Sequence, residues 1–356
     1  MKTVLVVGGG TAGHVLPTIP IIAKLKDSGY KVCFIGSRSG MEEGLLAGVG
    51  IVFFSIPTGR LRRYFSFQNV LDFFGFCFGV VCSLFIIYRI KPSVIFSKGG
   101  FVSLPVVLAG WLLRVPILAH ESDRSPGLAN RISMPFLSTY CTSFPSKEDL
   151  NTKFRHVYTG SPIRAEMLSG NRARGKEVLN YVDEKPILIV TGGSQGSEFI
   201  NQNVQSVLEE LLERFNVLHV CGPGNLLPIN KNGYKQIEYV SEDWGHILAA
   251  ADLVVSRAGA NALFEYLTLR KVCIFIPLSR KVSRGDQIDN SQYVVENDFG
   301  SVLDEDSLTS DSFLEAIVRT YEARESHRRS LESYSAIDSS TMIYDEILDL
   351  MAGRPD

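Results

Sequence analysis

A glycine-rich loop joins an apolar strand to a helical segment twice in this sequence, about half a chain apart. The first loop is GGGTAGH at 8–14, after the strand 3–7, and the second is TGGSQG at 191–196, after the strand 187–190. Each unit should place backbone N–H groups and the positive end of a helix dipole at the carboxyl end of a strand, where they can bind phosphate or diphosphate. The two units therefore predict two facing domains with a ligand between them.

Short β-type runs alternate with helical patterns along the chain, and most of these runs are continuously apolar. This pattern is typical of parallel sheets covered by helices on both faces. The predicted strands are 3–7, 31–35, 51–56, 93–97, 115–119, 140–143, 187–190, 217–221, 237–240, 253–256 and 273–276. We expect an α/β protein with two doubly wound, Rossmann-like domains, because 356 residues exceed what one core usually covers.

A polar, charged segment at 169–176 separates the two halves and indicates a boundary between Gly160 and Pro186. We divide the chain into an N-terminal domain at 1–162, a C-terminal domain at 163–340, and a C-terminal helix and tail at 341–356. The last segment could pack back on the N-terminal domain.

The composition indicates a folded protein and argues against nucleic-acid binding. The chain is 45% apolar and 21% charged, and its net charge of -2 offers no overall attraction to nucleic acid. The six cysteines have no CxxC pair or zinc-finger spacing, which predicts reduced core thiols in a cytoplasmic protein. A strand is predicted almost from the first residue, which leaves no room for an export signal.

The segment Phe73–Tyr88 contains no charged residue. It is shorter than the roughly 20 apolar residues that a membrane-spanning helix needs. A buried helix and a contact with a membrane are both compatible with this pattern.

The first glycine loop also satisfies the dinucleotide-binding spacing GxGxxG at 8–13. The second predicted strand, however, is followed by Ser37 and Arg38 rather than by an acidic residue for the ribose, which would suggest NADP at best. His14 is not part of that fingerprint. It could act as a general base on a bound hydroxyl, because the pKa of histidine lies near neutrality, or it could simply bond to its loop.

Three other polar clusters follow predicted strands. The run HESD at 120–123 would point into the same crevice as His14, and capping, a site role and metal binding are all possible there. A third phosphate-type loop at 256–261 precedes a helix on which Glu265 could accept two hydrogen bonds from a ribose diol. Gln287 and Asn290 would share one face if a helix begins near them.

Seven motifs in this order resemble the MurG family, the N-acetylglucosaminyltransferases that convert the lipid-linked muramyl-pentapeptide precursor of peptidoglycan into its disaccharide form. They are GGGTAGH at 8–14, FSKGGFVSLP at 96–105, HESDRSPGLAN at 120–130, TGSPIR at 159–164, TGGSQG at 191–196, SRAGANALFE at 256–265 and DQIDNS at 286–291. The resemblance extends across most of the chain. It implies a GT-B glycosyltransferase whose C-terminal domain holds the UDP-sugar donor and whose N-terminal domain serves the acceptor and the membrane.

The resemblance also implies roles for individual residues. His14 is the candidate general base and Glu121 a supporting residue. The implied donor contacts are Thr11, Ala12, Gly13, Asp123, Arg164, Ser194, Gln195, Val240, Ala260, Asn261, Ala262, Leu263, Phe264, Glu265, Gln287 and Asn290. The resemblance implies no resident cofactor and no aspartate-bound metal, it makes UDP-N-acetylglucosamine a substrate, and it leaves assistance by a divalent ion open.

The implied reaction is an inverting transfer of N-acetylglucosamine from UDP-N-acetylglucosamine to the 4-hydroxyl of the muramyl sugar of undecaprenyl-pyrophosphoryl-MurNAc-pentapeptide. Helix-terminal N–H groups and Arg164 would stabilise the departing diphosphate. Many members carry asparagine where this chain has Asp123, so a GT-B transferase with another sugar or acceptor is an alternative. An NADP-dependent oxidoreductase and a non-catalytic nucleotide-sugar-binding protein are the alternatives from other classes.

A basic and aromatic cluster precedes the apolar segment. This mixture suits a surface that meets anionic headgroups and inserts apolar side chains below them. Together with a lipid-linked acceptor, it predicts peripheral attachment to the cytoplasmic face of the bacterial cell membrane through Arg60, Arg62, Arg63, Tyr64, Phe65 and Phe67.

Overall fold

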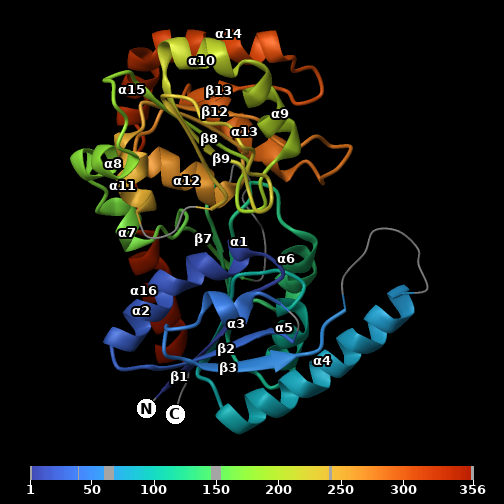
Figure 1. The fold of residues 1–356 in the computed structure, drawn as a ribbon. Coiled ribbons are helices and arrows are strands. Elements are labelled where there is room, and N and C mark those ends of the chain that lie inside the picture. The colour runs from blue at the N-terminus through green and yellow to red at the C-terminus, as the bar shows by residue number, and fades with distance from the viewer. Residues whose placement is uncertain (1, 39, 60–67, 146–153, 240–242, 354–356) are drawn as a thin grey trace. The chain divides into compact units, whose positions relative to one another are not determined.

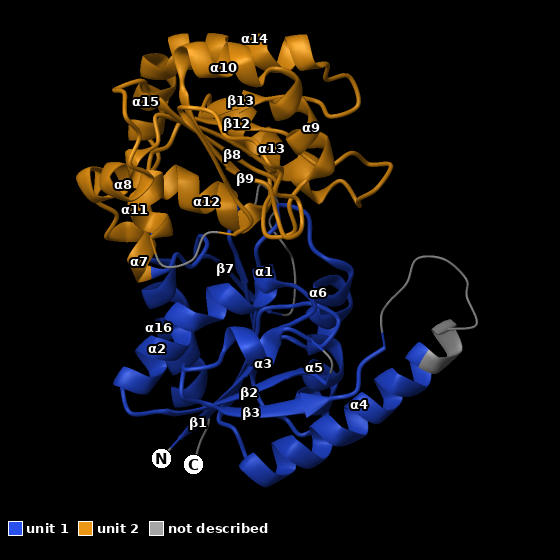
Figure 2. Cartoon of the chain, viewed as in Figure 1, with its two compact units in different colours: residues 1–164, 337–356 blue, residues 165–336 orange. Residues whose placement is uncertain are grey.

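The computed structural model describes residues 2–38, 40–59, 68–145, 154–239 and 243–353, without the side chains of 68–71. The chain forms two compact units, which Figure 2 shows in blue and orange. Unit 1 contains Met1–Arg164 and Ile337–Asp356, and unit 2 contains Ala165–Ala336. The chain thus leaves unit 1 after Arg164 and returns to it at Ile337, close to the divisions that the sequence suggests at 162 and 340.

Unit 1 is built on a seven-stranded parallel sheet in the order β3-β2-β1-β4-β5-β6-β7. Its strands are β1 (Thr3–Val7), β2 (Lys31–Ser37), β3 (Val52–Ile56), β4 (Val94–Ser97), β5 (Ile117–Glu121), β6 (Thr139–Thr142) and β7 (Arg155–Tyr158). β1 is central, with Val4 opposite Val32 on one side and Val94 on the other. The carboxyl ends of these strands therefore meet along one edge of the sheet.

Helices cover both faces of this sheet. They are α1 (Ala12–Val15), α2 (Ile19–Asp27), α3 (Glu42–Leu45), α4 (Gln68–Ile90), α5 (Ser103–Leu112), α6 (Leu128–Ser133) and α16 (Ser339–Ala352), with short 3-10 turns at Leu16–Thr18 and Met134–Phe136. Alternate residues of β1 enter two different cores, because successive side chains of a strand point to opposite faces. α2 and α16 bury their apolar side chains in one core, and α4 and α5 contribute to the other. Figure 1 shows α16 beside α2, although the two lie at opposite ends of the sequence.

Unit 2 contains a six-stranded parallel sheet in the order β10-β9-β8-β11-β12-β13. The strands are β8 (Ile187–Thr191), β9 (Asn216–Val220), β10 (Tyr234–Ile237), β11 (Leu253–Ser256), β12 (Cys273–Phe275) and β13 (Gly300–Val302). The helices are α7 (Ala165–Leu168), α8 (Arg172–Leu179), α9 (Glu198–Ser206), α10 (Leu208–Arg214), α11 (Trp244–Ala250), α12 (Ala260–Thr268), α13 (Asp286–Glu296), α14 (Ser310–Glu322) and α15 (Arg324–Glu332). The predicted fold class of two doubly wound parallel-sheet domains is confirmed.

Two edge strands escaped the sequence prediction, and a third was misplaced. β7 is only half-buried and carries arginine and histidine, while β13 is three residues long and begins with glycine, so neither has an apolar run. β10 covers Tyr234–Ile237 rather than 237–240. The prediction missed its start because Lys235 and Gln236 are polar and interrupt the apolar pattern. Edge strands are buried less than central ones, and their sequence signal is correspondingly weaker.

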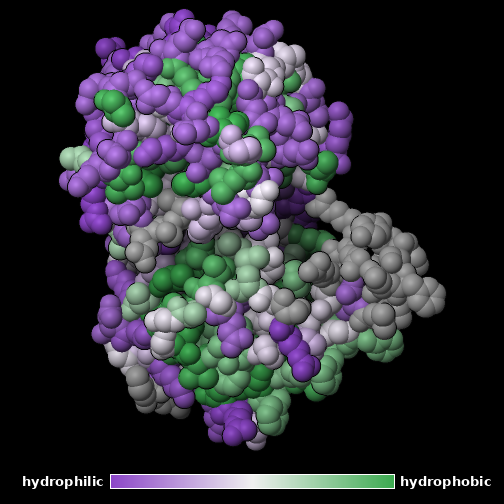
Figure 3. Space-filling model, viewed as in Figure 1, coloured by the Kyte–Doolittle hydropathy of each residue, from purple (hydrophilic) through white to green (hydrophobic). Residues whose placement is uncertain are grey.

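Of the two alternatives that the sequence left open for Phe73–Tyr88, a fully buried helix is wrong, because one side of α4 is exposed. Phe73, Phe74, Phe78, Val81, Phe85 and Tyr88 are each about 60–70% exposed, whereas Ser83 and Ile87 face the core. Within the described residues, Asp72–Ile90 is long and apolar enough to span a membrane by length and composition alone, with a mean hydropathy of 2.1 and 17% buried. Figure 3 shows hydrophobic residues along the edge of unit 1 where α4 lies. The six cysteines are free, but Cys77 on α4 is exposed, so the expectation of a core thiol is wrong at that position.

Candidate active site

Three loops meet in unit 1 at the carboxyl ends of β1, β4 and β5, where open parallel sheets bind ligands. The first two are in close contact. A Cβ atom at Gly100 would lie 2.0 Å from the carbonyl oxygen of Gly9, and one at Gly10 would lie 2.5 Å from the ring of Phe101. Glycine is therefore required where these loops touch.

His14 lies on the short helix α1, directly after the first glycine loop. Its Nδ1 is 2.9 Å from the hydroxyl oxygen of Thr11, and its backbone N–H donates to the Thr11 carbonyl at 3.1 Å. Thr11 is exposed, while Ala12, Gly13 and His14 are half-buried. The imidazole is thus held by its own loop, which is the structural role that the sequence allowed, and a side chain held in this way can still exchange a proton.

A carboxylate that the sequence analysis missed fills the inside of the first loop. Glu42, the first residue of α3, is fully buried. Its Oε1 accepts a hydrogen bond from the Gly10 N–H at 2.9 Å, and the Ser37 hydroxyl lies 3.1 and 3.0 Å from its two oxygens. A dinucleotide diphosphate would compete with Glu42 for the Gly10 N–H, which argues against the NADP alternative.

Within the HESD run at 120–123, the side chain of Glu121 stabilises the loop that follows β5. Glu121 is buried and accepts hydrogen bonds from the Asp123 N–H at 3.1 Å, the Gly127 N–H at 2.8 Å and the Asn130 amide at 2.9 Å. Burial, and secondly the charge of Asp123, raise the pKa of Glu121, while these hydrogen bonds lower it. Its oxygens are occupied within the loop, so a structural role is favoured over the supporting catalytic role.

The side chain of His120 also has a structural position inside unit 1. It is fully buried, and its Nε2–H donates to the carbonyl of Gly160 at 2.9 Å. Burial, followed by the nearby charge of Lys98, lowers the pKa of His120 well below its usual value. This side chain is therefore neutral at physiological pH and ties β5 to the segment after β7.

Lys98, which follows β4, is a second charged residue that the sequence analysis left without a role. It is buried, and its ammonium donates a hydrogen bond to the Ser122 hydroxyl. Burial lowers its pKa to about 8, while the carboxylates of Glu121 and Asp123 oppose that shift. Lys98 thus places a positive charge near Asp123, the half-buried predicted donor contact.

Unit 2 has a pocket of about 550 Å³ at the second glycine loop. Gly193, Ser194 and Gln195 are exposed in it, and Ala262 and Gln287 also line it. The loop makes internal hydrogen bonds, from the Gly193 N–H to the Thr191 hydroxyl at 3.1 Å and from the Gly196 N–H to the Gly193 carbonyl at 3.0 Å. Four predicted donor contacts, Ser194, Gln195, Ala262 and Gln287, are thus brought together.

Arg257 supports the floor of this pocket. It is buried, its Nη1 donates to the Ile276 carbonyl at 3.1 Å, and its Nη2 donates to the Ser197 hydroxyl at 2.7 Å and to Glu305 at 2.5 Å. The other Glu305 oxygen accepts from the Ser279 N–H at 2.9 Å. The sequence analysis found the loop that carries Arg257 but assigned the arginine no role, because its partners come from distant segments.

The remaining predicted residues of unit 2 occupy α12 and α13. Asn261 and Glu265 are half-buried, whereas Leu263 and Phe264 are buried and the Leu263 N–H donates to the Gly259 carbonyl within the helix. The helix start at Ala260 is therefore the part of this segment whose amides lack an intrahelical acceptor.

Gln287 and Asn290 both lie on α13, so the condition under which the sequence placed them on one helix face is met. The side-chain oxygen of Gln287 accepts from the Leu278 N–H at 3.1 Å, and the amide of the fully buried Asn290 donates to the Ala258 carbonyl at 3.1 Å. Asn290 thus holds the loop before α12, while Gln287 borders the pocket.

Some predicted residues lie elsewhere. Arg164 is half-buried at the end of unit 1. Val240 and the predicted membrane contacts Arg60, Arg62, Arg63, Tyr64, Phe65 and Phe67 lie outside the described residues.

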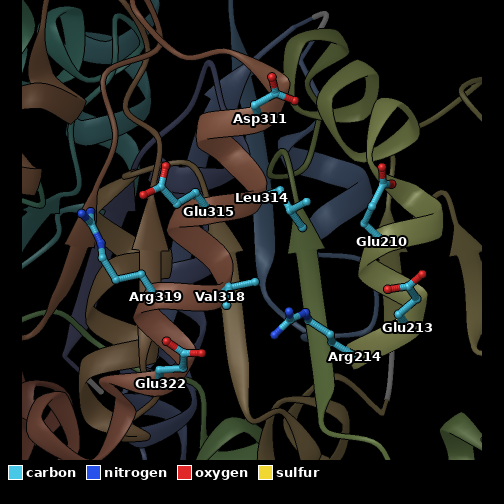
Figure 4. A pocket seen from close by; sticks show the side chains of 9 residues that line it. All are labelled: Glu210, Glu213, Arg214, Asp311, Leu314, Glu315, Val318, Arg319 and Glu322. Atoms are coloured by element: carbon cyan, nitrogen blue, oxygen red, sulfur yellow. The ribbon is translucent and has the colours of Figure 1, made fainter.

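A second cavity of unit 2, of about 570 Å³, lies between α10 and α14. Figure 4 shows it lined by five carboxylates and two arginines, an acidic setting that repels a diphosphate. In the described part of the chain, no group of three or more His, Cys, Asp or Glu side chains is placed to hold a metal ion.

Known proteins resemble this chain over nearly its full length. Residues 4–142 match the glycosyltransferase family 28 N-terminal domain, and residues 187–341 match the glycosyltransferase family 28 C-terminal domain. The UDP-N-acetylglucosamine–N-acetylmuramyl-(pentapeptide) pyrophosphoryl-undecaprenol N-acetylglucosamine transferase of Clostridium tetani is 43% identical, covering 98% of this chain and 97% of its own. The enzyme of the same name from Geobacillus kaustophilus is 44% identical, covering 95% of both chains.

Among solved structures, Acinetobacter baumannii MurG superposes with a TM-score of 0.77 at 22% identity, covering 98% of this chain and 100% of its own, a likeness of fold. The identity to the two curated transferases, over nearly complete chains, shows the family. The protein belongs to the MurG family of glycosyltransferases.

Proposed function

We propose that this protein is an inverting glycosyltransferase that moves N-acetylglucosamine from UDP-N-acetylglucosamine to the 4-hydroxyl of the muramyl sugar of undecaprenyl-pyrophosphoryl-MurNAc-pentapeptide, converting lipid I into lipid II. The observation that carries the proposal is the identity of 43% to a transferase of that name across 98% of the chain. The open glycine loop of unit 2 supports it, because Ser194 and Gln195 are exposed in a pocket beside the carboxyl end of β8, where open parallel sheets bind ligands.

The donor diphosphate binds at the loop after β8, near Ser194 and Gln195. Gln287 borders the same pocket and contacts the sugar, while Glu265 accepts hydrogen bonds from the ribose hydroxyls. Arg164, together with backbone N–H groups, stabilises the negative charge that develops as UDP departs.

His14 acts as the base for the acceptor hydroxyl. When its Nδ1–H donates to the Thr11 hydroxyl, Nε2 is the basic nitrogen and takes the proton of the 4-hydroxyl. The acceptor oxygen then forms a bond to the anomeric carbon while the bond to UDP breaks, so an α-linked donor becomes a β-linked product. The proton remains on His14 until solvent removes it.

The transfer is tested with radiolabelled UDP-N-acetylglucosamine and a defined lipid-linked muramyl acceptor. We expect label in the lipid product, and release of UDP that depends on the acceptor. Binding of UDP, UDP-N-acetylglucosamine and NADPH is measured in parallel. Tight binding of NADPH without binding of UDP would contradict the proposal, and transfer from another nucleotide sugar would favour a GT-B enzyme of different specificity.

We also propose that the protein attaches peripherally to the cytoplasmic face of the bacterial membrane, with the exposed face of α4 among its contacts. Phe74, Phe78, Val81 and Phe85 lie at spacings of three and four residues and form one apolar stripe, which suits insertion below the headgroups. The proposed acceptor is anchored in the membrane by its lipid chain, so the enzyme must reach the bilayer surface to bind it.

The triple variant Phe74→Ser/Phe78→Ser/Phe85→Ser tests this attachment. It should lose sedimentation with vesicles of phosphatidylglycerol and phosphatidylcholine while it retains UDP binding, because the replaced rings are exposed rather than packed. Unchanged vesicle binding would remove α4 from the contact surface.

A further inference from the structure

The Glu42 carboxylate occupies space that is available only because two neighbouring residues, Gly9 and Gly40, have no side chain. A Cβ atom at Gly9 would lie 2.2 Å from its Oε1, and one at Gly40 would lie 1.7 Å from its Oε2. No larger residue fits at either position without displacing the carboxylate. Part of the glycine content of the first loop therefore serves an internal side chain rather than an external ligand.

Burial of this carboxyl group is costly unless it receives hydrogen bonds. The Gly10 N–H and the Ser37 hydroxyl supply them, from two different segments of unit 1. The carboxylate in turn accepts the hydrogen bond of the Gly10 N–H. Gly10 has φ of +89°, a conformation that favours glycine. Loss of the carboxylate would leave that N–H without its hydrogen-bond partner, which is unfavourable for a backbone group away from water.

The loop that Glu42 anchors leads directly to the candidate base. Gly10, its hydrogen-bond donor, is bonded covalently to Thr11. The Thr11 hydroxyl contacts the imidazole of His14, and the Thr11 carbonyl accepts from the His14 backbone N–H. A shift of Gly10 would therefore move both groups that orient His14. Proton transfer depends on the donor–acceptor distance, so a small displacement here lowers turnover.

We propose that Glu42 is a positioning residue for the transfer, acting as an internal anion that holds the first glycine loop in the shape that His14 requires. The proposal rests on the proposed function in one respect, namely that His14 is the base. It also means that the Gly10 N–H is not available to a substrate phosphate. Unit 1 must then bind the acceptor diphosphate through other groups.

The test compares Glu42→Ala and Glu42→Gln with Glu43→Ala, a matched control because Glu43 is the exposed next residue of α3. We expect Glu42→Ala to lower kcat at least about 10-fold, since a general base contributes about 10²–10⁴-fold in total. Its affinity for UDP-N-acetylglucosamine should stay unchanged, and Glu43→Ala should behave as wild type. Added formate should restore part of the kcat of Glu42→Ala only, because it can occupy the vacated carboxylate position.

Glu42→Gln keeps one oxygen for the Gly10 N–H and should lose less kcat than Glu42→Ala. It is also the variant that decides the question if Glu42→Ala does not fold. A wild-type kcat in a folded Glu42→Ala protein, or in Glu42→Gln when the alanine variant fails to fold, would overturn the proposal. A loss of kcat accompanied by an equal loss of UDP-N-acetylglucosamine affinity would overturn it as well.

A substrate-independent readout separates this proposal from the proposed function. The ¹⁵N signals of the His14 imidazole, assigned with a His14→Gln variant, should change in Glu42→Ala and stay unchanged in Glu43→Ala. If wild-type protein transfers no N-acetylglucosamine, the proposed function fails, and these signals still report whether Glu42 orients His14. Identical His14 signals in wild type and in both Glu42 variants would overturn the positioning role.

Discussion

The glycine loops after β1 and β8 occupy equivalent places in their units but are completed in different ways. Each follows a central strand, with β2 and β4 beside β1, and β9 and β11 beside β8. In unit 1, the buried carboxylate of Glu42 binds the inside of the loop. In unit 2, the loop bonds internally and borders a pocket of about 550 Å³. Similar local sequences thus produce one loop filled from within and one open to a ligand.

The difference arises from the segments that follow the neighbouring strands. After β2 the chain turns into α3, whose first residue is Glu42. After β9 it passes through Gly222, where an added Cβ atom would lie 2.5 Å from the Cα atom of Gly196. Backbone packing between two glycines therefore takes the place of a side-chain carboxylate, and Gly193, Ser194 and Gln195 of the second loop remain exposed in the pocket.

The largest effect is expected for His14→Ala. This variant tests the proposed division in which the first loop carries the base and the second loop binds the donor. Turnover on the lipid-linked acceptor should fall about 10²–10⁴-fold, since the base is lost. UDP-N-acetylglucosamine affinity, measured by calorimetry, should not change. Thr11→Val, which removes one contact of the imidazole, should produce a smaller loss. Near-normal turnover of His14→Ala would remove His14 as the base, and a matching loss of donor affinity would break the proposed division.

Arg257→Met tests what holds the open pocket together. The variant should lose up to about 3–5 kcal/mol of unfolding free energy, because it leaves the Glu305 carboxylate, whose side chain is only 13% exposed, without its arginine partner. Arg280→Met is the control, since the Arg280–Asp289 pair lies at the surface and should contribute at most about 1 kcal/mol. Urea unfolding followed by Trp244 fluorescence, in a Trp111→Phe background, reports on unit 2. Equal losses for both variants would contradict this account.

Alanine at two positions of the second loop separates packing from exposure. Gly193 and Gly196 have φ of +85° and +75°, so alanine should cost about 1–2 kcal/mol at either position. At Gly196 the added Cβ atom would also lie 2.4 Å from the Cys221 carbonyl oxygen, whereas nothing lies within 4 Å at Gly193. Gly196→Ala should therefore have the lower unfolding free energy by urea titration. Equal stability of the two variants would show that the glycine packing contributes little.

The smallest predicted effect concerns the buried charge of Lys98 in unit 1. Its pKa of about 8 in the folded protein lies below the ordinary value of 10.5, so between these values the unfolded chain binds more protons. Burial therefore destabilises the fold below about pH 8, and this cost diminishes as the pH rises. Between about pH 7.5 and about pH 9.5, wild type should gain about 1–2 kcal/mol relative to Lys98→Met.

Urea unfolding followed by Trp111 fluorescence, in a Trp244→Phe background, measures this gain in unit 1. Lys26→Met controls for the loss of a positive charge, because Lys26 is exposed on α2. A wild-type pH dependence that matches that of Lys98→Met would show that this lysine is not penalised by burial.

The central strands and both glycine loops were predictable because their signals are local. β1, β8 and β11 are short, continuous apolar runs, and the glycines that follow them within three residues indicate the turn into a helix. The spacing of Gln287 and Asn290 indicated a shared face only on the condition that a helix begins near them, and α13 meets that condition. The half-buried edge strands β7 and β13 have no such run, and they became evident only in the assembled sheet.

The site residues that were missed act through partners distant in the sequence. Gly10 and Glu42 are separated by 32 residues, Ser197 and Arg257 by 60, and Arg257 and Glu305 by 48. An acidic residue that begins a helix is ordinarily a solvated charge, so nothing in the neighbourhood of Glu42 distinguishes it. The exposed side of α4 was ambiguous for a related reason, because an apolar run does not specify which of its faces will be covered.

The sequence by itself determined the two parallel-sheet domains, the positions of the glycine loops and the family, because hydrophobic runs, glycine spacing and ordered motifs are properties of neighbouring residues. Only the tertiary structure decided which loop is filled and which is open, because that depends on where the segments after β2 and β9 return to the sheet edge. It also decided that Glu121 builds its own loop and that Lys98 and Arg257 are buried. A buried charge is tolerated only where folding brings hydrogen-bond partners to it, and those partners are chosen by the packing of the whole unit.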